Sequence, residues 1–202
     1  MANERALLVQ LIDKINHDQV MLPSLPQVAM AVLELAQQST CTLPQLANEI
    51  SKDPGLSAGM IKRANQMNAE RVNKACTVLS ALMQLGLEHA LEAAIEAADN
   101  QLFYAEQPWV GEQFEQLQNS NWTLVSTALA ILACEHSRGH LLNLNADTLK
   151  LACQVHNIGR LPVLVQVDQQ PHLFSDKAEL SACLTRLQGP LGGVLLTQYQ
   201  FP

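Results

Sequence analysis

The chain has 202 residues, a formal net charge of −7 at pH 7 and only 12 lysines and arginines. No basic run is present to neutralise phosphates and no apolar stretch is long enough to cross a bilayer, so nucleic-acid binding and membrane insertion are both disfavoured. Hydrophobic residues make up 48% of the chain but aromatic residues only 4%. We therefore expect an aliphatic core of the kind that packed helices form.

The number of cysteines and the first residues of the chain indicate in which cellular compartment the protein is found. The number of cysteines is odd and no Cys-x-x-Cys occurs, which favours buried, reduced thiols over a disulfide framework. The opening residues contain Glu4 and Arg5 and lack the apolar segment of a signal peptide. These features predict a cytoplasmic protein. The cysteines are Cys41, Cys76, Cys134, Cys153 and Cys183.

Apolar residues recur at helical spacing from the start of the chain. Residues 7–15 predict a first amphipathic helix. Pro26 is suited to the first turn of a second helix, and Thr42 is expected to cap a short third one. A fourth helix should begin with Asp53 as its N-cap and Pro54 as its first residue.

The middle of the chain carries one predicted helix break and one predicted boundary. Residues 77–98 read as helical throughout, and we expect Gly86 to divide them into two helices. Pro108 and Gly111 then lie close together and mark the best internal boundary. The predicted parts are residues 1–107, an N-terminal helical part, and residues 108–202, a second helical part of the same continuous domain.

The second half predicts further helices. A long helix is expected over about residues 114–136, and Asn145 should cap the next one. Residues 163–167 are compatible with either helix or strand, and two more helices are expected over 176–187 and 190–199. Strand alternation is otherwise absent, so the predicted fold class is all-α.

Five segments, taken together and in order, resemble one known family. They read LPSLPQVAMAVLELA, ISKDPGLSAGMIKRAN, TVLSALMQLGLEHAL, NWTLVSTALAILA and CQVHNIGRL. This series resembles the HDOD family, the HD-related output domains of bacterial signalling proteins, over roughly residues 21–202. The resemblance implies a multi-helix fold in which an N-terminal helical lobe packs on a degenerate HD-like half. The motif residues, expected to be structural, are Leu22, Pro23, Leu25, Pro26, Asp53, Pro54, Leu56, Ala64, Asn65, Leu85, Gly86, Trp122, His156 and Gly159.

The resemblance also implies where an HD-type metal site would lie. It places one histidine on the long helix, a His-Asp pair at His156 and Asn157, and a final aspartate on a later helix. Here Val125 occupies the expected histidine position, and Asn157 replaces the aspartate. Valine cannot coordinate a metal and a neutral amide is a poor ligand for transition metals. With only Asp176 as a later acid, we expect His156 and Asn157 to be a remnant pair, with no metal, cofactor or catalytic residue.

Other candidate motifs also have structural interpretations. Cys134, His136 and His140 are close in sequence, but Gly139 is expected to end the helix between the two histidines. Histidines at a helix C-terminus are favoured by the helix dipole, so this cluster does not predict a metal site. The glycines of residues 189–196 lack a phosphate-binding context, and we expect them to let two helices approach closely.

The resemblance implies a non-enzymatic output or scaffold domain that acts through protein–protein interaction, linked to cyclic-dinucleotide or two-component signalling. Two alternatives stay open. One is a degenerate HD-type metal-dependent phosphohydrolase. The other is a nucleotide-sensing domain that uses the former catalytic cleft.

The end of the chain suggests where a partner would bind. The apolar face of the last predicted helix, with Leu191, Val194, Leu195 and Tyr199, is expected to pack on the long helix. We expect the C-terminal edge beyond it to carry bare apolar surface. Such surfaces tend to be buried by partners, so this edge is predicted to be either a homodimer contact or the face that binds a signalling protein.

Overall fold

The computed structural model describes residues 2–67, 73–174 and 177–201. Within these ranges the regular structure is helical and no β-strand is formed, which confirms the predicted all-α class. The one extended pairing is an isolated bridge between Ser24 and Leu102, where the Ser24 N–H donates to the Gln101 carbonyl at 2.7 Å. None of the helices in the described part of the chain combines the length and apolarity needed to cross a bilayer.

The helices of the first half begin and end close to the predicted signals. Pro26 and Pro54 are the first residues of their helices, and Gly86 separates two helices with a φ of 79°, a conformation that glycine adopts without strain. The predicted division at Gly86 is therefore confirmed. The helices are α1 (Ala2–Asn16), α2 (Pro26–Ala36), α3 (Leu43–Ile50), α4 (Pro54–Met67), α5 (Val78–Leu85) and α6 (Leu87–Asn100).

The second half contains the longest helix. The stretch that was ambiguous between helix and strand, residues 163–167, is helical. The long helix begins at Pro108, so Gly111 lies inside it rather than in a linker. The elements are α7 (Pro108–Ser137), α8 (Ala146–Val155), α9 (Arg160–Gln169), the 3₁₀ helix η1 (Pro171–Leu173) and α10 (Lys177–Gln198).

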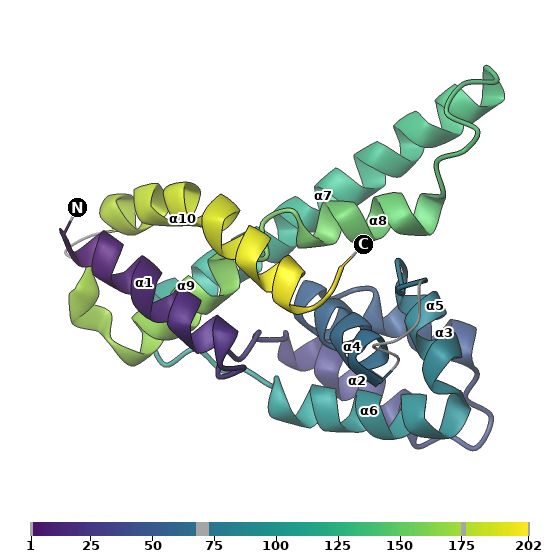
Figure 1. The fold of residues 1–202 in the computed structure, drawn as a ribbon, viewed down its shortest axis with the longest axis horizontal. Coiled ribbons are helices and arrows are strands. Elements are labelled where there is room, and N and C mark those ends of the chain that lie inside the picture. The colour runs from purple at the N-terminus through teal and green to yellow at the C-terminus, as the bar shows by residue number, and fades with distance from the viewer. Residues whose placement is uncertain (1, 68–72, 175–176, 202) are drawn as a thin grey trace.

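The prediction of two C-terminal helices was wrong, because α10 continues through Pro190. A proline inside a helix removes one hydrogen bond and crowds the carbonyl four residues earlier, which bends a helix without having to end it. Leu187 and Leu191, on either side, are both buried and hold the two segments against the core. Figure 1 shows α10 changing direction partway along its length.

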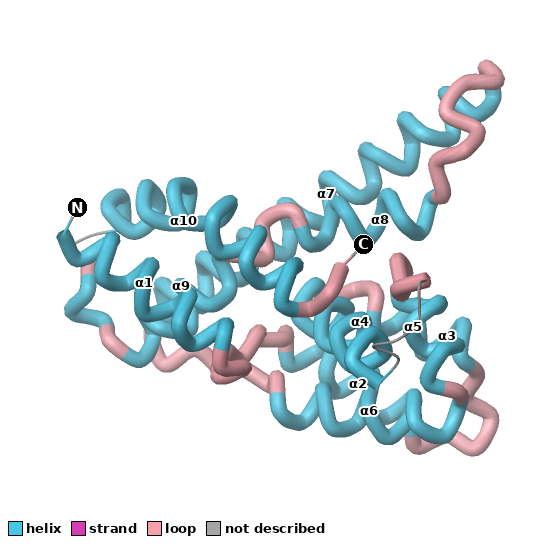
Figure 2. Tube along the Cα trace, in the orientation of Figure 1, coloured by secondary structure: helices cyan, strands magenta, loops and turns pink. Residues whose placement is uncertain are grey.

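Three groups of helices make up the molecule. Helix α10 packs against α1 and α9, so the first and last helices lie side by side, and α2 to α6 pack against one another as a second group. Helices α7 and α8 pack side by side, and their far end projects from the body (Figures 1 and 2). We call the projecting part, made by the end of α7, the start of α8 and residues 138–145 between them, the α7–α8 arm. A loop joins the two helices at the tip of this α7–α8 arm.

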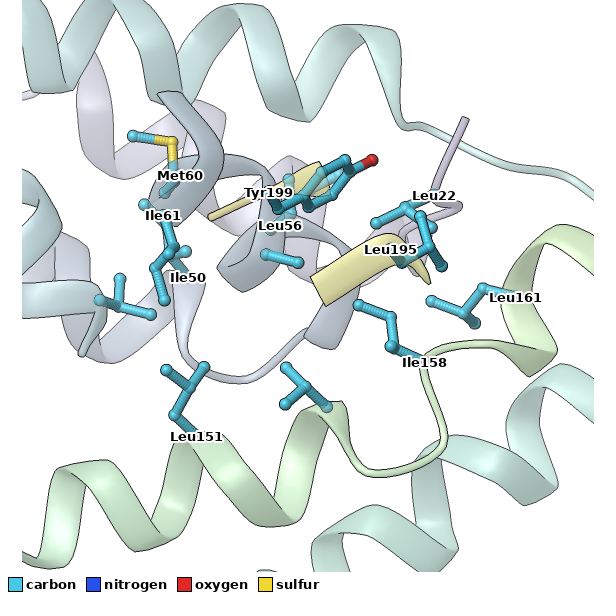
Figure 3. Packing of buried hydrophobic residues seen from close by; sticks show 14 of the residues in the cluster. Leu22, Ile50, Leu56, Met60, Ile61, Leu151, Ile158, Leu161, Leu195 and Tyr199 are labelled. Atoms are coloured by element: carbon cyan, nitrogen blue, oxygen red, sulfur yellow. The ribbon is translucent and has the colours of Figure 1, made fainter. Parts of the chain in front are cut away.

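One buried core runs through both halves of the chain. Figure 3 shows Leu22 and Leu56 from the first half in the same cluster as Ile158 and Leu195 from the second. Each of these four side chains is at most 2% exposed. Burial of large aliphatic side chains is the main stabilising term in such a core.

The packing of α10 differs from the prediction. Its apolar face lies against α1 and α9 rather than on the long helix. Leu191 and Leu195 are fully buried and Tyr199 is nearly so, and no large hydrophobic side chain of the described part of residues 177–201 is exposed. Exposed large hydrophobic side chains lie on other elements, among them Ile131, Leu141 and Leu142 near the tip of the α7–α8 arm.

Candidate functional site

His156 and Asn157 lie in the turn between α8 and α9 and point to different surroundings. The His156 ring is exposed, and its Nδ1 lies 2.7 Å from the Cys153 carbonyl oxygen, a contact that satisfies the ring at the helix end. Asn157 is 3% exposed and faces α7. The two residues therefore do not present their side chains to a common point.

Asn157 is paired with Asn121 of α7 through both side-chain amides. The Asn157 Nδ2 donates to Asn121 Oδ1 at 2.8 Å, and the Asn121 Nδ2 donates to Asn157 Oδ1 at 3.3 Å. Val125, at the histidine position that the resemblance implies, is buried one turn further along α7. No signal in the sequence pairs Asn121 with Asn157, because the contact depends on how α7 packs against the turn between α8 and α9.

Two glutamines extend this polar cluster toward the N-terminal helices. The Gln154 Nε2 of α8 donates to the Ser51 carbonyl just after α3, and the Gln118 Nε2 of α7 donates to Asp53 Oδ2 at 3.2 Å. Both glutamines are almost completely buried. The polar cluster therefore joins α7 and α8 to the segment that connects α3 and α4. We refer to Asp53, Gln118, Asn121, Gln154 and Asn157 as the amide network.

Asp53 is the one acid of the amide network and is fully buried. Its Oδ1 accepts from the Leu56 N–H at 2.9 Å, which confirms the predicted cap of α4. Its Oδ2 accepts from the Leu25 N–H at 3.2 Å, at the start of α2, a contact that the sequence did not indicate. Burial raises the pKa of Asp53 from its ordinary value of 3.8 to about 6, although the backbone N–H groups that bind it act in the opposite direction.

A small cavity of about 10 Å³ adjoins the amide network. The Oε1 atoms of Gln118 and Gln154 are buried and have no hydrogen-bond partner among the described residues. A space of this size can hold at most about one water molecule. The lining residues are Lys52, Pro54, Gln118, Asn121, Trp122, Val125 and Gln154.

The residues present do not fit a divalent metal of the HD type. Asn157 is neutral and its amide is already engaged by Asn121. The nearby acid of α9, Asp168, accepts from the Glu106 and Gln107 N–H groups at 3.0 and 2.9 Å. In the described ranges no group of three His, Cys, Asp or Glu side chains is placed to hold a metal ion. The later acid named from the sequence, Asp176, lies outside the described residues.

The histidines at the end of α7 serve the helix terminus. The His136 Nε2 lies 2.9 Å from the Leu141 carbonyl, and the His140 Nδ1 lies 2.9 Å from Glu135 Oε2. Gly139 follows the helix with a φ of 79°. His136 lies in the last turn of α7 and His140 lies after it, so the two rings have different partners. Cys134 is exposed.

Two motif residues hold distant parts of the chain together. The Asn65 Oδ1 accepts from the Ala75 N–H at 2.8 Å, and its Nδ2 donates to the Gln200 carbonyl at 2.9 Å. A Cβ added at Gly159 would lie 2.3 Å from the Gln188 carbonyl oxygen, so only glycine lets this turn approach α10. The buried motif residues also include Leu22, Pro23, Pro54, Leu56, Ala64 and Leu85, whereas Trp122 is 41% exposed.

Comparison of the chain with known families and structures identifies similar proteins. The profile described as HDOD domain matches residues 22–202. A chain from Shewanella amazonensis SB2B, described as a candidate metal-dependent phosphohydrolase, is 35% identical over 100% of this chain and 72% of its own, with a TM-score of 0.52. Two structures of the MmoQ response regulator from Methylococcus capsulatus str. Bath, 21% and 19% identical, share the fold with TM-scores of 0.63 and 0.64. They cover 90% of this chain and 74% and 69% of their own. No curated protein matches the chain.

Proposed function

The chain belongs to the HDOD domain family, and on that premise we propose that it is a non-enzymatic signal-transduction output or scaffold domain that binds a partner protein. The fold that it shares with MmoQ, described as a response regulator, supports a place in bacterial two-component or cyclic-dinucleotide signalling. The same proposal places the domain in the cytoplasm. It assigns the amide network a structural role, because neutral amides take the place of charged metal ligands.

The observation that carries the proposal is the exposed apolar surface near the tip of the α7–α8 arm. No charged residue occurs in α7 between Glu115 and Glu135. Near the tip, Ile131, Leu141 and Leu142 are 57%, 55% and 68% exposed. Exposed apolar surface of this kind marks sites where proteins bind one another, since it costs free energy to leave it in water.

The arm also suits a helix-packing partner. Helix α7 is flanked by α8 over this region, and its outer side carries small residues such as Ala130 and Ala133, both exposed. Small side chains let a second helix approach closely, and between Glu115 and Glu135 α7 has no ionic side chain that a partner would have to desolvate. A second copy of the chain is the alternative occupant of this surface.

The proposal is tested with a photo-cross-linking amino acid placed at Leu142 in the native bacterium. Met83 of α5, which is 65% exposed, provides the matched position outside the arm. We expect a discrete adduct with one signalling protein at Leu142 and none at Met83. Equal adducts at both positions, or none at Leu142, would contradict the proposal, and an adduct only with a second copy of the chain would favour the homodimer.

A variant with Ile131→Glu and Leu142→Glu should then lose the identified partner while unfolding at the same temperature as the parent chain. Met83→Glu is the control and should retain it. The phosphohydrolase alternative is addressed separately with bis(p-nitrophenyl) phosphate and Mn²⁺. We expect no hydrolysis, whereas turnover that disappears in His156→Ala would favour the enzyme.

A further inference from the structure

A polar cavity that is separate from the amide network lies between α7, α9 and α10. Its volume is about 190 Å³, and its lining includes Ser120 of α7, Arg160 at the start of α9 and Ser181 of α10. Helix α9 packs against both α7 and α10, which places these side chains on elements that pack together. The cavity shares no described lining residue with the small cavity beside the amide network. It is therefore distinct from the position of an HD-type metal site.

Arg160 brings a positive charge to this cavity without a negative partner. Among the described residues that line the cavity it is the only charged one. Three other arginines form ion pairs with glutamates, namely Arg63, Arg138 and Arg186. Burial lowers the pKa of Arg160, and no carboxylate acts in the opposite direction. The guanidinium stays charged at neutral pH, so an anion in the cavity would compensate for the water that it has lost.

Gln188 of α10 fixes the orientation of the Arg160 guanidinium. The Arg160 Nε donates to Gln188 Oε1 at 2.6 Å. The Nη1 and Nη2 groups donate to no acceptor among the described residues, so this edge of the guanidinium is free to bind. An arginine binds an oxyanion best through two parallel N–H groups of this kind.

Two serines and a glutamine add hydrogen-bond donors to the lining. Other hydroxyl groups on the same helices, such as those of Thr123 and Thr185, donate to the carbonyl four residues earlier. Within the described residues, the exposed hydroxyls of Ser120 and Ser181 form no such bond and can donate into the cavity. The Gln116 Oε1 accepts from a neighbouring glutamine at 3.1 Å, so its Nε2 remains available as a donor.

We propose that this cavity binds a phosphate group, either as the free ion or as part of a small phosphorylated compound. Its donors come from helices on different sides, an arrangement that suits a tetrahedral anion with several oxygens better than a planar carboxylate. The volume of about 190 Å³ is below the several hundred Å³ that drug-sized ligands occupy, so the compound must be small. This site lies apart from the α7–α8 arm and does not rest on the proposed protein-binding function.

NMR titration of the isotopically labelled full chain tests the ligand class. The probes are inorganic phosphate, glycerol phosphate, acetate and chloride, as sodium salts at constant ionic strength and pH. We expect phosphate to shift the Arg160 Nε–H signal and the Ser120 and Ser181 amide signals until they saturate. Acetate should bind about tenfold more weakly, because it presents fewer oxygens to the donors, and chloride should cause no saturable shift.

The outcomes of this titration are distinct. Tighter binding of glycerol phosphate than of inorganic phosphate would support a phosphorylated compound as the ligand, and the reverse order would support the free ion. Shifts that fail to saturate with either phosphate probe, or acetate binding as tight as that of phosphate, would overturn the proposal.

Variants test whether Arg160 carries the binding. Arg160→Gln should weaken phosphate binding by at least about tenfold, and the Ser120→Ala, Ser181→Ala double variant should weaken it by about fivefold or more. The matched control is Arg63→Gln, which removes the same charge outside this cavity and should bind phosphate as the parent chain does. A folded Arg160→Gln protein with unchanged phosphate affinity would overturn the proposal. If that protein does not fold, unchanged affinity in the double serine variant would do the same.

Discussion

Asn121 and Asn157 exchange hydrogen bonds through their side chains at 2.8 and 3.3 Å, and each is 3% exposed. The pair ties α7 to the turn between α8 and α9 at the place where an HD-type enzyme would carry charge. Because each amide both donates and accepts, the contact needs a donor and an acceptor on both side chains. This complementarity can be tested by restoring a carboxylate.

Asn157→Asp should destabilise the protein in a pH-dependent way. The new carboxyl cannot donate to Asn121 Oδ1 when ionised, and burial should raise its pKa above the unfolded value of about 3.9. The protonated form is then favoured by folding, so stability falls as the pH rises through the folded pKa. We expect a loss of about 3 kcal/mol at pH 8 and a smaller one at pH 4, measured by urea unfolding.

The control for the Asn157→Asp variant is Asn119→Asp, at an exposed position of α7 two residues before Asn121. It adds the same charge at an exposed position and should change the free energy of unfolding by less than about 0.5 kcal/mol at either pH. Equal effects of the two substitutions would show that the amide pair contributes nothing specific.

Asp53 should make the parent chain less stable at neutral pH than at pH 4. Its folded pKa of about 6 lies above its ordinary value of 3.8, so the folded state holds the proton more tightly than the unfolded state does. Stability from this group is complete below pH 3.8 and is lost as the pH rises to about 6, by roughly 3 kcal/mol. Asp53→Asn should remove that part of the pH dependence.

The measurement is urea unfolding from pH 4 to pH 7, read as the difference between variant and parent. Asp99→Asn, at an exposed position of α6, is the matched substitution and should have a much smaller effect on the pH profile. If the stability of Asp53→Asn and that of the parent chain changed with pH in the same way, the titration would not belong to Asp53.

Gly159→Ala should be strongly destabilising. The added Cβ would meet two backbone atoms of α10, the Gln188 oxygen at 2.3 Å and the Gly192 nitrogen at 2.5 Å, which cannot move aside as a flexible side chain could. We expect a loss of about 3 kcal/mol by thermal or urea unfolding. Gly193→Ala, with nothing within 4 Å of the new atom, should instead stabilise the helix by about 0.5 to 1 kcal/mol.

Asn65→Ala should loosen the contact between the end of α4 and the end of the chain. It leaves the Ala75 N–H without its acceptor and the Gln200 carbonyl without its donor. We expect a cost of about 2 kcal/mol and faster hydrogen exchange at the Ala75 amide. Asn48→Ala, exposed on α3, is the control and should have little effect on stability or on exchange. Unchanged hydrogen exchange at the Ala75 amide in Asn65→Ala would show that Asn65 does not hold these segments together.

Much of the local structure could be predicted from the sequence. The first residues of α2 and α4, the break at Gly86 and the cap of α8, where Asn145 Oδ1 accepts from the Asp147 and Thr148 N–H groups, all agree with the predictions. These signals act within about four residues, because caps, prolines and glycines bind or restrict the backbone next to them. The family could be predicted for a similar reason, since its motifs are short segments in a set order.

The tertiary structure decided which distant residues meet. Nothing near Asn157 in sequence points to Asn121, and nothing near Asp53 points to Gln118, because each pair is brought together by the packing of separate helices. The same holds for α1 on α10 and for the continuous α10. Residue patterns define which face of a helix is apolar, but the choice of neighbour depends on how all the faces fill one core at close packing. That choice buries the apolar face of α10 and leaves Ile131, Leu141 and Leu142 of the α7–α8 arm exposed.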